Sequence, residues 1–331
     1  MSENAIEVEN LKGYYKGTFG VVFAINGVSF TIKKGEIVGI AGESGCGKST
    51  LAELITGFPM PLLHYEEGVI NVYGNNIYEL SKEKLRKEVS CKIIAYVPQY
   101  SMESLIPIRR IRDFILEVMR ERTGQIIVAE EKEKLLESTY NHFRSLGLNP
   151  REVLDKYPHE LSGGMKQRVT IAISTLWNPR LLIADEPTSA LDVTSQRLLI
   201  EMLYNLKEMG KTETIIFISH DIPTLLQICT RCIVMYAGGI VEDGPMNDII
   251  QSPLHPYTKG LVLSIVSFNP DGTLQTSLAS IPGKPPDLRN PPTGCKFHPR
   301  CSQRLPICSE EYPPFFTSKG SNHPVRCWLY K

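Results

Sequence analysis

The sequence predicts an α/β fold with a mostly parallel sheet, followed by a small irregular C-terminal region. Over residues 1–250, short β-branched apolar runs bounded by turn residues alternate with longer segments of helical periodicity. Strands that alternate with helices favour a parallel sheet. From about residue 252 the composition changes, and residues 281–292 are rich in proline, which cannot continue a helix. We therefore expect one domain at residues 1–251 and a second at 252–331.

The individual elements follow from the same patterns. The expected strands are residues 6–11, 28–32, 36–41, 68–72, 93–97, 181–184, 214–219, 231–235 and 239–243. The expected helices are residues 48–56, 111–122, 130–146, 163–176 and 195–208. Between about residues 100 and 165 the pattern is helical with few strand signals, which predicts a helical insertion in the α/β domain.

Composition excludes several classes of protein. The chain has 331 residues, 42% of them hydrophobic, and 36 Lys and Arg balance 36 Asp and Glu. This composition excludes disorder as the main state. The balanced charge argues against binding nucleic acid through bulk positive charge. No apolar run approaches the roughly 20 residues that span a bilayer, and the polar N-terminus is unlike a secretory signal. We expect a cytoplasmic chain that serves a membrane only through partners.

A glycine-rich segment is the first sign of chemistry. Residues 42–50 fit the pattern G-x-x-x-x-G-K-[ST] between an apolar strand and a helical pattern, the context of a phosphate-binding loop. Its backbone N–H groups and the helix N-terminus would bind phosphate oxygens. Lys48 would reach the β- and γ-phosphates of ATP, and Ser49 would ligate Mg²⁺. The loop residues are Gly42, Glu43, Ser44, Gly45, Cys46, Gly47, Lys48, Ser49 and Thr50.

Two carboxylates follow a second apolar strand. Asp185 and Glu186 come directly after residues 181–184, at the carboxyl end of the expected strand, where ligand sites of α/β sheets lie. Asp185 would hold Mg²⁺, directly or through water. Glu186 points to the other side of the chain and could orient or deprotonate an attacking water.

A second glycine-rich turn follows the helical insertion. Ser162, Gly163 and Gly164 precede a helical pattern and offer another set of N–H donors suited to phosphate. One ATP is already held by the loop at residues 42–50. The second loop therefore suggests a site shared between two nucleotide-binding domains.

Together these motifs resemble those of ATP-binding cassette (ABC) ATPases, in the same order and over nearly the whole chain. Gln99 after an expected strand matches the family's Q-loop, and Asp192 ends a segment that matches the D-loop. His220 matches the switch histidine. Tyr15, or less favourably Tyr14, stands where the family places an aromatic residue that stacks on adenine.

The resemblance implies a P-loop NTPase (RecA-like) core with an antiparallel β subdomain and a helical insertion, plus the small irregular C-terminal extension. It implies that two such domains pair head to tail around two ATP molecules, so that Ser162 and its glycines contact the nucleotide of the partner. By the same resemblance Glu186 orients the water, His220 contacts the γ-phosphate and Gln99 senses Mg²⁺, while Asp192 lies near the shared nucleotide.

Four cysteines are crowded into the last part of the chain: Cys295, Cys301, Cys308 and Cys327. A reducing cytosol disfavours disulfides. Four thiolates could hold tetrahedral zinc, although close C-x-x-C pairs are absent. A 4Fe–4S cluster also needs four thiolates and tolerates wider spacing, and the site could also stay empty.

The segments around these cysteines carry a second resemblance. Residues 253–258 (P-L-H-P-Y-T), 294–301 (G-C-K-F-H-P-R-C) and 323–327 (H-P-V-R-C) resemble the C-terminal extension of oligopeptide/dipeptide-type ABC ATPases. Some members of that subfamily hold an iron–sulfur cluster there, so the resemblance leads us to favour a 4Fe–4S cluster over zinc or an empty site. Because the region is too small for a large core, we expect the cysteine site to act as a structural staple.

These resemblances imply an ATP-hydrolysing subunit of an importer of peptides or related solutes. Its partners would be two transmembrane permease subunits, an extracytoplasmic solute-binding protein, and a paralogous ATPase subunit or a second copy, with no nucleic acid. It would lie peripherally on the cytoplasmic face of the cell membrane. An oligosaccharide or nickel importer shares these motifs and stays open. A soluble non-transport ABC ATPase is disfavoured by the single cassette and balanced charge.

Overall fold

The computed structural model describes residues 3–18, 20–123, 129–264, 281–317 and 322–331. The chain divides into two compact units, each described by itself: Met1–Glu79 with Ile216–Lys331, and Leu80–Ile215. The expected boundary near residue 252 separates two regions of the sequence that both contribute to the first unit, and it stays a prediction.

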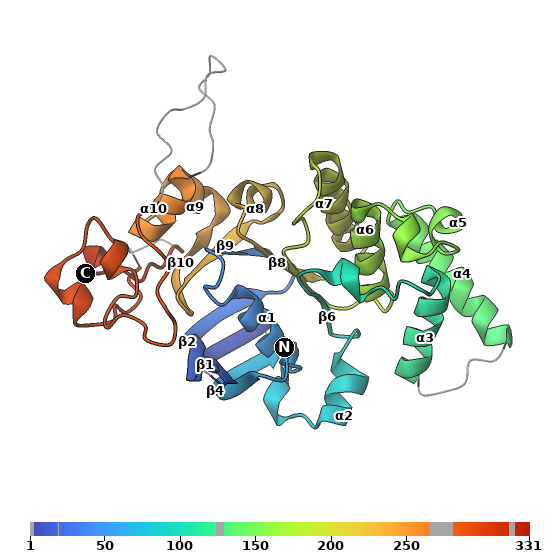
Figure 1. Cartoon of the computed structure of the whole chain (residues 1–331), viewed down its shortest axis with the longest axis horizontal. Coiled ribbons are helices and arrows are strands. Elements are labelled where there is room, and N and C mark those ends of the chain that lie inside the picture. The colour runs from blue at the N-terminus through green and yellow to red at the C-terminus, as the bar shows by residue number, and fades with distance from the viewer. Residues whose placement is uncertain (1–2, 19, 124–128, 265–280, 318–321) are drawn as a thin grey trace, which may run out of the picture. The chain divides into compact units, whose positions relative to one another are not determined.

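The first unit contains a four-stranded antiparallel sheet, the antiparallel β subdomain expected from the family resemblance (Figure 1). Its strands, in spatial order, are β2 (Gly20–Lys33), β1 (Asn4–Gly17), β4 (Leu63–Val72) and β5 (Asn75–Asn76). Val8 is opposite Phe30 of β2 and Ile70 of β4, and all three side chains are buried. β1 and β2 extend beyond the predicted ranges because bulges absorb the glycine and polar residues that interrupt the alternation.

The same unit contains the strand that precedes the glycine-rich loop. β3 (Ile37–Ala41) is buried at every residue and runs parallel to β9 (Arg231–Tyr236), which pairs antiparallel with β10 (Gly239–Pro245). The helices of this unit are α1 (Lys48–Thr56), α8 (Ile222–Ile228), α9 (Met246–Gln251) and α10 (Pro256–Leu263). α1 matches its predicted range, whereas the sequence analysis missed the three others, which are shorter than nine residues.

The second unit contains β6 (Ile94–Val97) and β7 (Leu181–Asp185), paired in parallel, with Ile94 opposite Leu181. Its helices are α2 (Lys82–Lys84), α3 (Ile111–Thr123), α4 (Ala129–Ser145), α5 (Pro150–Val153), α6 (Gly163–Ser174) and α7 (Val193–Glu208) (Figure 1). Helices α3, α4 and α5 lie in the stretch that was predicted to be helical. β8 (Thr214–Ser219) spans the boundary between the units.

The described part of the region after residue 281 has short helical turns and isolated β-bridges at Phe316 and Val325, and so it is irregular as predicted. The turns are His298–Arg300, Pro306–Ser309 and Trp328–Tyr330. β10 anchors this region, because buried Glu242 lies 2.7 Å from His323 Nε2 and accepts the backbone N–H groups of Leu254 and His255. No helix in the described parts of the chain is long and apolar enough to cross a membrane.

Candidate nucleotide site

Glycine is required at two positions of the loop between β3 and α1. Gly42 has a φ of 153° and Gly47 a φ of 107°, both in the region that L-residues with side chains rarely adopt. A Cβ atom at Gly42 would lie 2.7 Å from Cys46 Sγ, and one at Gly47 would lie 2.5 Å from the Ala24 carbonyl oxygen. The backbone of the loop therefore packs closely on its surroundings and turns sharply into α1.

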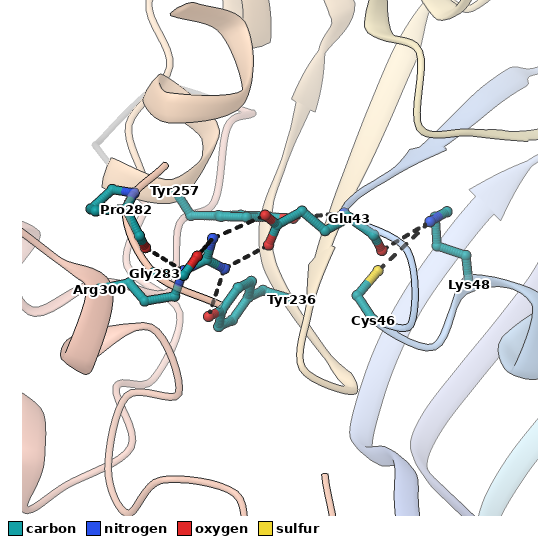
Figure 2. Close-up of polar contacts among 8 residues, drawn as sticks. All are labelled: Glu43, Cys46, Lys48, Tyr236, Tyr257, Pro282, Gly283 and Arg300. Carbon is teal, nitrogen blue, oxygen red and sulfur yellow. Dashed lines mark hydrogen bonds and ion pairs between the residues drawn. The ribbon is translucent and has the colours of Figure 1, made fainter. Parts of the chain in front are cut away.

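Lys48 lies inside this loop. Its side chain is almost fully buried, and Nζ donates a 2.8 Å hydrogen bond to the carbonyl oxygen of Gly42. Nζ also donates to the carbonyl oxygen of Glu43 at 3.1 Å (Figure 2). These neutral carbonyls are weak partners for an ammonium group compared with phosphate oxygens. The arrangement holds a cation at the mouth of the α1 N-terminus, where an anion would bind.

The remaining loop residues differ in their access to solvent. Ser44 and Gly45 are exposed, Ser49 is half-buried, and Thr50 is buried. Burial raises the pKa of the Cys46 thiol, so this cysteine is protonated at neutral pH in the folded loop.

Two adjacent tyrosines were candidates for stacking on adenine. The Tyr15 hydroxyl shares a 3.2 Å hydrogen bond with Thr50 Oγ1 at the start of α1. Tyr14 stacks on His64 with a ring separation of 5.3 Å and also approaches Phe23. Tyr15 is therefore the tyrosine that contacts the loop's own helix.

His220 belongs to the same unit as the loop. It directly follows β8, whose last residue Ser219 is buried, and it is itself exposed. The Ser219 hydroxyl accepts the backbone N–H of Asp221 at 2.9 Å. This turn places the histidine at the carboxyl end of the strand.

In the second unit the structure brings two predicted catalytic residues together. Gln99 Nε2 donates a 3.1 Å hydrogen bond to Glu186 Oε2. The preceding carboxylate, Asp185, is 1% exposed and accepts from the Tyr96 hydroxyl at 3.3 Å. Glu186 also has a φ of 46°, which costs a non-glycine residue about 1–2 kcal/mol. Strain of this kind is typical of functional sites.

The second glycine-rich turn starts helix α6. Ser162 is its N-cap, and its side chain accepts the backbone N–H of Met165 at 3.3 Å. Ser162 and Gly163 are exposed, whereas a Cβ atom at Gly164 would lie 2.7 Å from Ser195 Cβ on α7. The first glycine is open to a partner and the second serves the packing of two helices within the unit.

Asp192 has a structural role that the sequence analysis did not predict. It is the N-cap of α7, and its carboxylate accepts from the backbone N–H of Ser195 at 2.9 Å and from the Ser195 hydroxyl at 2.7 Å. These bonds lower the pKa of Asp192. The exposed side chain fixes the start of α7.

All eight cysteines lie in described parts of the chain, and all are free thiols. Cys295 donates its backbone N–H to the Cys308 carbonyl at 2.8 Å. Burial raises the pKa of the Cys295 thiol to about 11, and the nearby charges of Cys308, Cys327 and Cys301 add to the rise. The four thiols are thus within electrostatic reach of one another. However, no group of three or more His, Cys, Asp or Glu side chains among the described residues is arranged to hold a metal ion.

The sequence analysis did not predict two residues that contact the loop, Tyr257 and Arg300. The Tyr257 hydroxyl accepts the backbone N–H of Glu43 at 2.8 Å, and the Arg300 guanidinium pairs with the Glu43 carboxylate (Figure 2). More than 200 residues separate each of them from the loop. The segments that contain them resemble a C-terminal extension, and no local pattern connects them with Glu43.

Two family profiles match the chain. The family described as "ABC transporter" matches residues 25–189, and "Oligopeptide/dipeptide transporter, C-terminal region" matches residues 241–308. The dipeptide transport ATP-binding protein DppD of Caldanaerobacter subterraneus subsp. tengcongensis is 40% identical, over 98% of this chain and 97% of that protein. The oligopeptide transport ATP-binding protein OppD of Bacillus subtilis is also 40% identical, over 98% and 88%.

Solved structures give the same assignment of the fold. The dimeric ABC transporter cassette MJ0796 superimposes with a TM-score of 0.62 at 26% identity, over 73% of this chain and 98% of that one. Its post-hydrolysis dimer bound to ADP and phosphate gives a TM-score of 0.61 at 27% identity, with the same coverage.

Proposed function

Because this chain belongs to the ATP-binding proteins of oligopeptide/dipeptide-type ABC transporters, we propose that it binds MgATP at residues 42–50 and couples its hydrolysis to peptide uptake. The P-loop NTPase fold and the ATPase activity are those of the family. The proposal concerns which residues carry out each step, which partners they serve and what the C-terminal cysteines hold.

Binding of the nucleotide is assigned to the loop and its neighbours. Lys48 exchanges its two carbonyl partners for the β- and γ-phosphates, whose charge makes the stronger hydrogen bonds. By the family resemblance Ser49, Gln99 and Asp185 would hold Mg²⁺, which would neutralise charge on the phosphates. Tyr15 stacks on adenine, an assignment that its contact with the loop's own helix supports.

Hydrolysis is assigned to Glu186, and the Gln99–Glu186 hydrogen bond is the observation that carries this part of the proposal. While Gln99 donates to the carboxylate, its hydrogen bond uses one lone pair of Glu186 Oε2 and makes that oxygen a weaker acceptor for a proton from water. With Gln99 turned to Mg²⁺, this hydrogen bond would be lost and the oxygen would become a stronger acceptor for the attacking water. Gln99 would thereby link binding of the metal to the start of catalysis, and His220 would contact the γ-phosphate.

The exposed turn at Ser162 and Gly163 is assigned to the nucleotide of a partner ATPase, either a paralogue or a second copy. Both residues are accessible, and the N-terminus of α6 offers backbone N–H groups to a phosphate. Asp192, although it caps α7, lies on the exposed start of that helix and is assigned to the same interface.

Coupling to the membrane subunits is assigned to the segment that follows Gln99. Tyr100 is 64% exposed and Ile108 is 84% exposed, so both side chains are accessible to a membrane subunit. Between them, buried Ser101 donates to Gln167 Oε1 of α6 at 3.2 Å. A permease subunit that covers these side chains would therefore act on α6, which begins at the glycine-rich turn of Ser162 and Gly163. This assignment puts the chain on the cytoplasmic face of the membrane.

The four C-terminal cysteines are assigned to a 4Fe–4S cluster, with zinc as the alternative. Their mutual electrostatic influence and the Cys295–Cys308 backbone bond support the assignment. The thiolates would have to move into ligand geometry as the group binds. Anaerobically purified protein should contain about four iron atoms per chain. Stoichiometric zinc without iron, or no metal at all, would contradict the cluster.

The function is tested in proteoliposomes that contain this chain, its ATPase partner, the two membrane subunits and a peptide-loaded binding protein. We expect peptide-dependent ATP hydrolysis and accumulation of labelled peptide, both lost in Glu186→Gln. Replacing exposed Ile108 by serine should uncouple uptake from hydrolysis, whereas Met209→Ser, 42% exposed at the end of α7, should not. ATP hydrolysis that ignores the binding protein, with no peptide uptake, would contradict the proposal.

A further inference from the structure

The C-terminal extension holds the second residue of the phosphate-binding loop through an arginine. Arg300 Nη1 and Nη2 donate to the two carboxylate oxygens of Glu43, at 2.7 and 3.0 Å (Figure 2). The arginine side chain is 6% exposed and the glutamate side chain 25%. A two-point contact of this kind fixes both the charge and the orientation of the carboxylate.

The rest of the arginine is held by groups of the same unit. Nε donates to the Pro282 carbonyl at 2.8 Å, Nη2 to the Gly283 carbonyl at 3.3 Å, and Nη1 to the Tyr236 hydroxyl at 3.3 Å. These partners keep the guanidinium aimed at the loop. The Glu43 carboxylate, as its anionic partner, raises the pKa of Arg300, so the arginine is charged at every physiological pH.

The backbone of Glu43 is held as well. Its N–H donates to the hydroxyl of Tyr257, a fully buried residue of α10, at 2.8 Å. Its carbonyl accepts from Lys48 Nζ at 3.1 Å. Glu43, whose carbonyl accepts a hydrogen bond from Lys48, is thus held through its backbone by Tyr257 and through its side chain by Arg300, both in the last quarter of the chain.

The ion pair between Arg300 and Glu43 affects the charge that a bound ATP would meet in the loop. Glu43 contributes a negative charge to a loop that must receive a triphosphate. Without compensation, that charge would repel the ligand and would also attract Lys48 away from the phosphates. Arg300 supplies one buried positive charge, which lies directly against the Glu43 carboxylate.

We propose that Arg300 is a positioning residue for ATP binding: it neutralises and orients Glu43, and so makes the phosphate-binding loop competent through the C-terminal extension. The proposal rests on the proposed function, in which residues 42–50 bind the triphosphate.

The test is equilibrium ATP binding to the full chain with Arg300→Gln. We expect the affinity to fall about tenfold, ~1.4 kcal/mol, with little change in the turnover rate at saturating ATP. Raising the salt concentration should shrink the defect, because screening weakens repulsion between Glu43 and the phosphates. The matched control is Arg289→Gln, which removes an exposed arginine of the same region that pairs with Asp287; its affinity should stay within about twofold of wild type.

A second substitution separates charge from loss of structure. Adding Glu43→Gln to Arg300→Gln removes the uncompensated carboxylate and should recover most of the lost affinity. Arg300→Lys keeps the charge but loses the two-point contact, so its ATP affinity should lie between those of wild type and Arg300→Gln, and the Arg300→Lys variant keeps the test decisive if Arg300→Gln does not fold.

Two outcomes would overturn the proposal: wild-type affinity in Arg300→Gln, or a loss that neither salt nor Glu43→Gln reduces. Lys48→Ala distinguishes this failure from failure of the proposed site. If Lys48→Ala weakens ATP binding and Arg300→Gln does not, the loop binds ATP and only the role of Arg300 is wrong.

Discussion

Gly163 and Gly164 are adjacent at the start of α6, yet the structure predicts opposite responses to alanine. Among the described residues, nothing lies within 4 Å of a Cβ atom placed at Gly163. A Cβ atom at Gly164 would lie 2.7 Å from Ser195 Cβ and would also clash with the Ser195 hydroxyl. The two substitutions therefore separate the proposed contact with a partner's nucleotide from packing within the unit.

The sizes of the two effects follow from this geometry. Alanine at Gly163 should stabilise the helix by up to about 1 kcal/mol, because glycine is the poorer helix former. Alanine at Gly164 gains the same amount but overpacks the α6–α7 contact, at a cost of about 1–3 kcal/mol. We expect Gly164→Ala to be less stable than wild type by about 1 kcal/mol, and Gly163→Ala to be no less stable than wild type.

Urea denaturation followed by helical circular dichroism measures the stability difference, and steady-state ATP hydrolysis by the assembled transporter measures function. Gly163→Ala should lose hydrolysis although it is stable, because its methyl group stands where the partner's γ-phosphate is proposed to bind. In a Ser195→Gly background, Gly164→Ala should cause no loss of stability relative to Ser195→Gly alone, whereas in a Ser195→Ala background part of the loss should remain because Cβ remains. Equal stability of the two alanine variants, or full hydrolysis by Gly163→Ala, would refute this reasoning.

Three further predictions concern the nucleotide site and pH. Glu186→Gln should abolish turnover while ATP stays bound, as measured by retained nucleotide after gel filtration; normal turnover would exclude this carboxylate as the group that orients water. Tyr15→Ala should weaken ATP binding severalfold, because an aromatic contact contributes about 1 kcal/mol. Tyr14→Ala should leave ATP binding unchanged, and equal losses in the two variants would exclude a stacking role for Tyr15. Burial lowers the pKa of His142 and of His255 to about 4, so between pH 6.5 and 4 the unfolded chain binds more protons than the folded one. Stability should therefore fall as the pH drops from 6.5 to 5, by about 2 kcal/mol for each histidine, and a thermal unfolding midpoint that stays constant over this range would contradict the buried neutral histidines.

Local patterns in the sequence were sufficient to predict the strands, whereas the antiparallel β subdomain was expected only from the family resemblance and helices α8, α9 and α10 were missed. Every expected strand overlaps an observed one, and α1 has the predicted bounds, because glycine, lysine and a short apolar strand set both ends of this helix locally. The lengths of β1 and β2 were underestimated, since bulges let strands pass through Asn10 and the glycines without losing register. Such pairing depends on the neighbouring strand, which no local window contains.

The site was predictable only where its residues form contiguous motifs. The loop at residues 42–50 and the turn at Ser162 are short segments whose chemistry is read from spacing alone. The contacts of Gln99 with Glu186 and of Arg300 with Glu43 join residues far apart in the chain. Their pairing is a result of the tertiary fold and could not be read from one sequence.

The central claim is that the loop at residues 42–50 holds the triphosphate through Lys48, and equilibrium ATP titration of the wild type against Lys48→Ala tests it most directly. Loss of a charge-assisted contact to phosphate is worth about 1.5–3 kcal/mol, so the affinity should fall by roughly ten- to a hundredfold. ATP affinity unchanged in Lys48→Ala would mean that the nucleotide binds elsewhere.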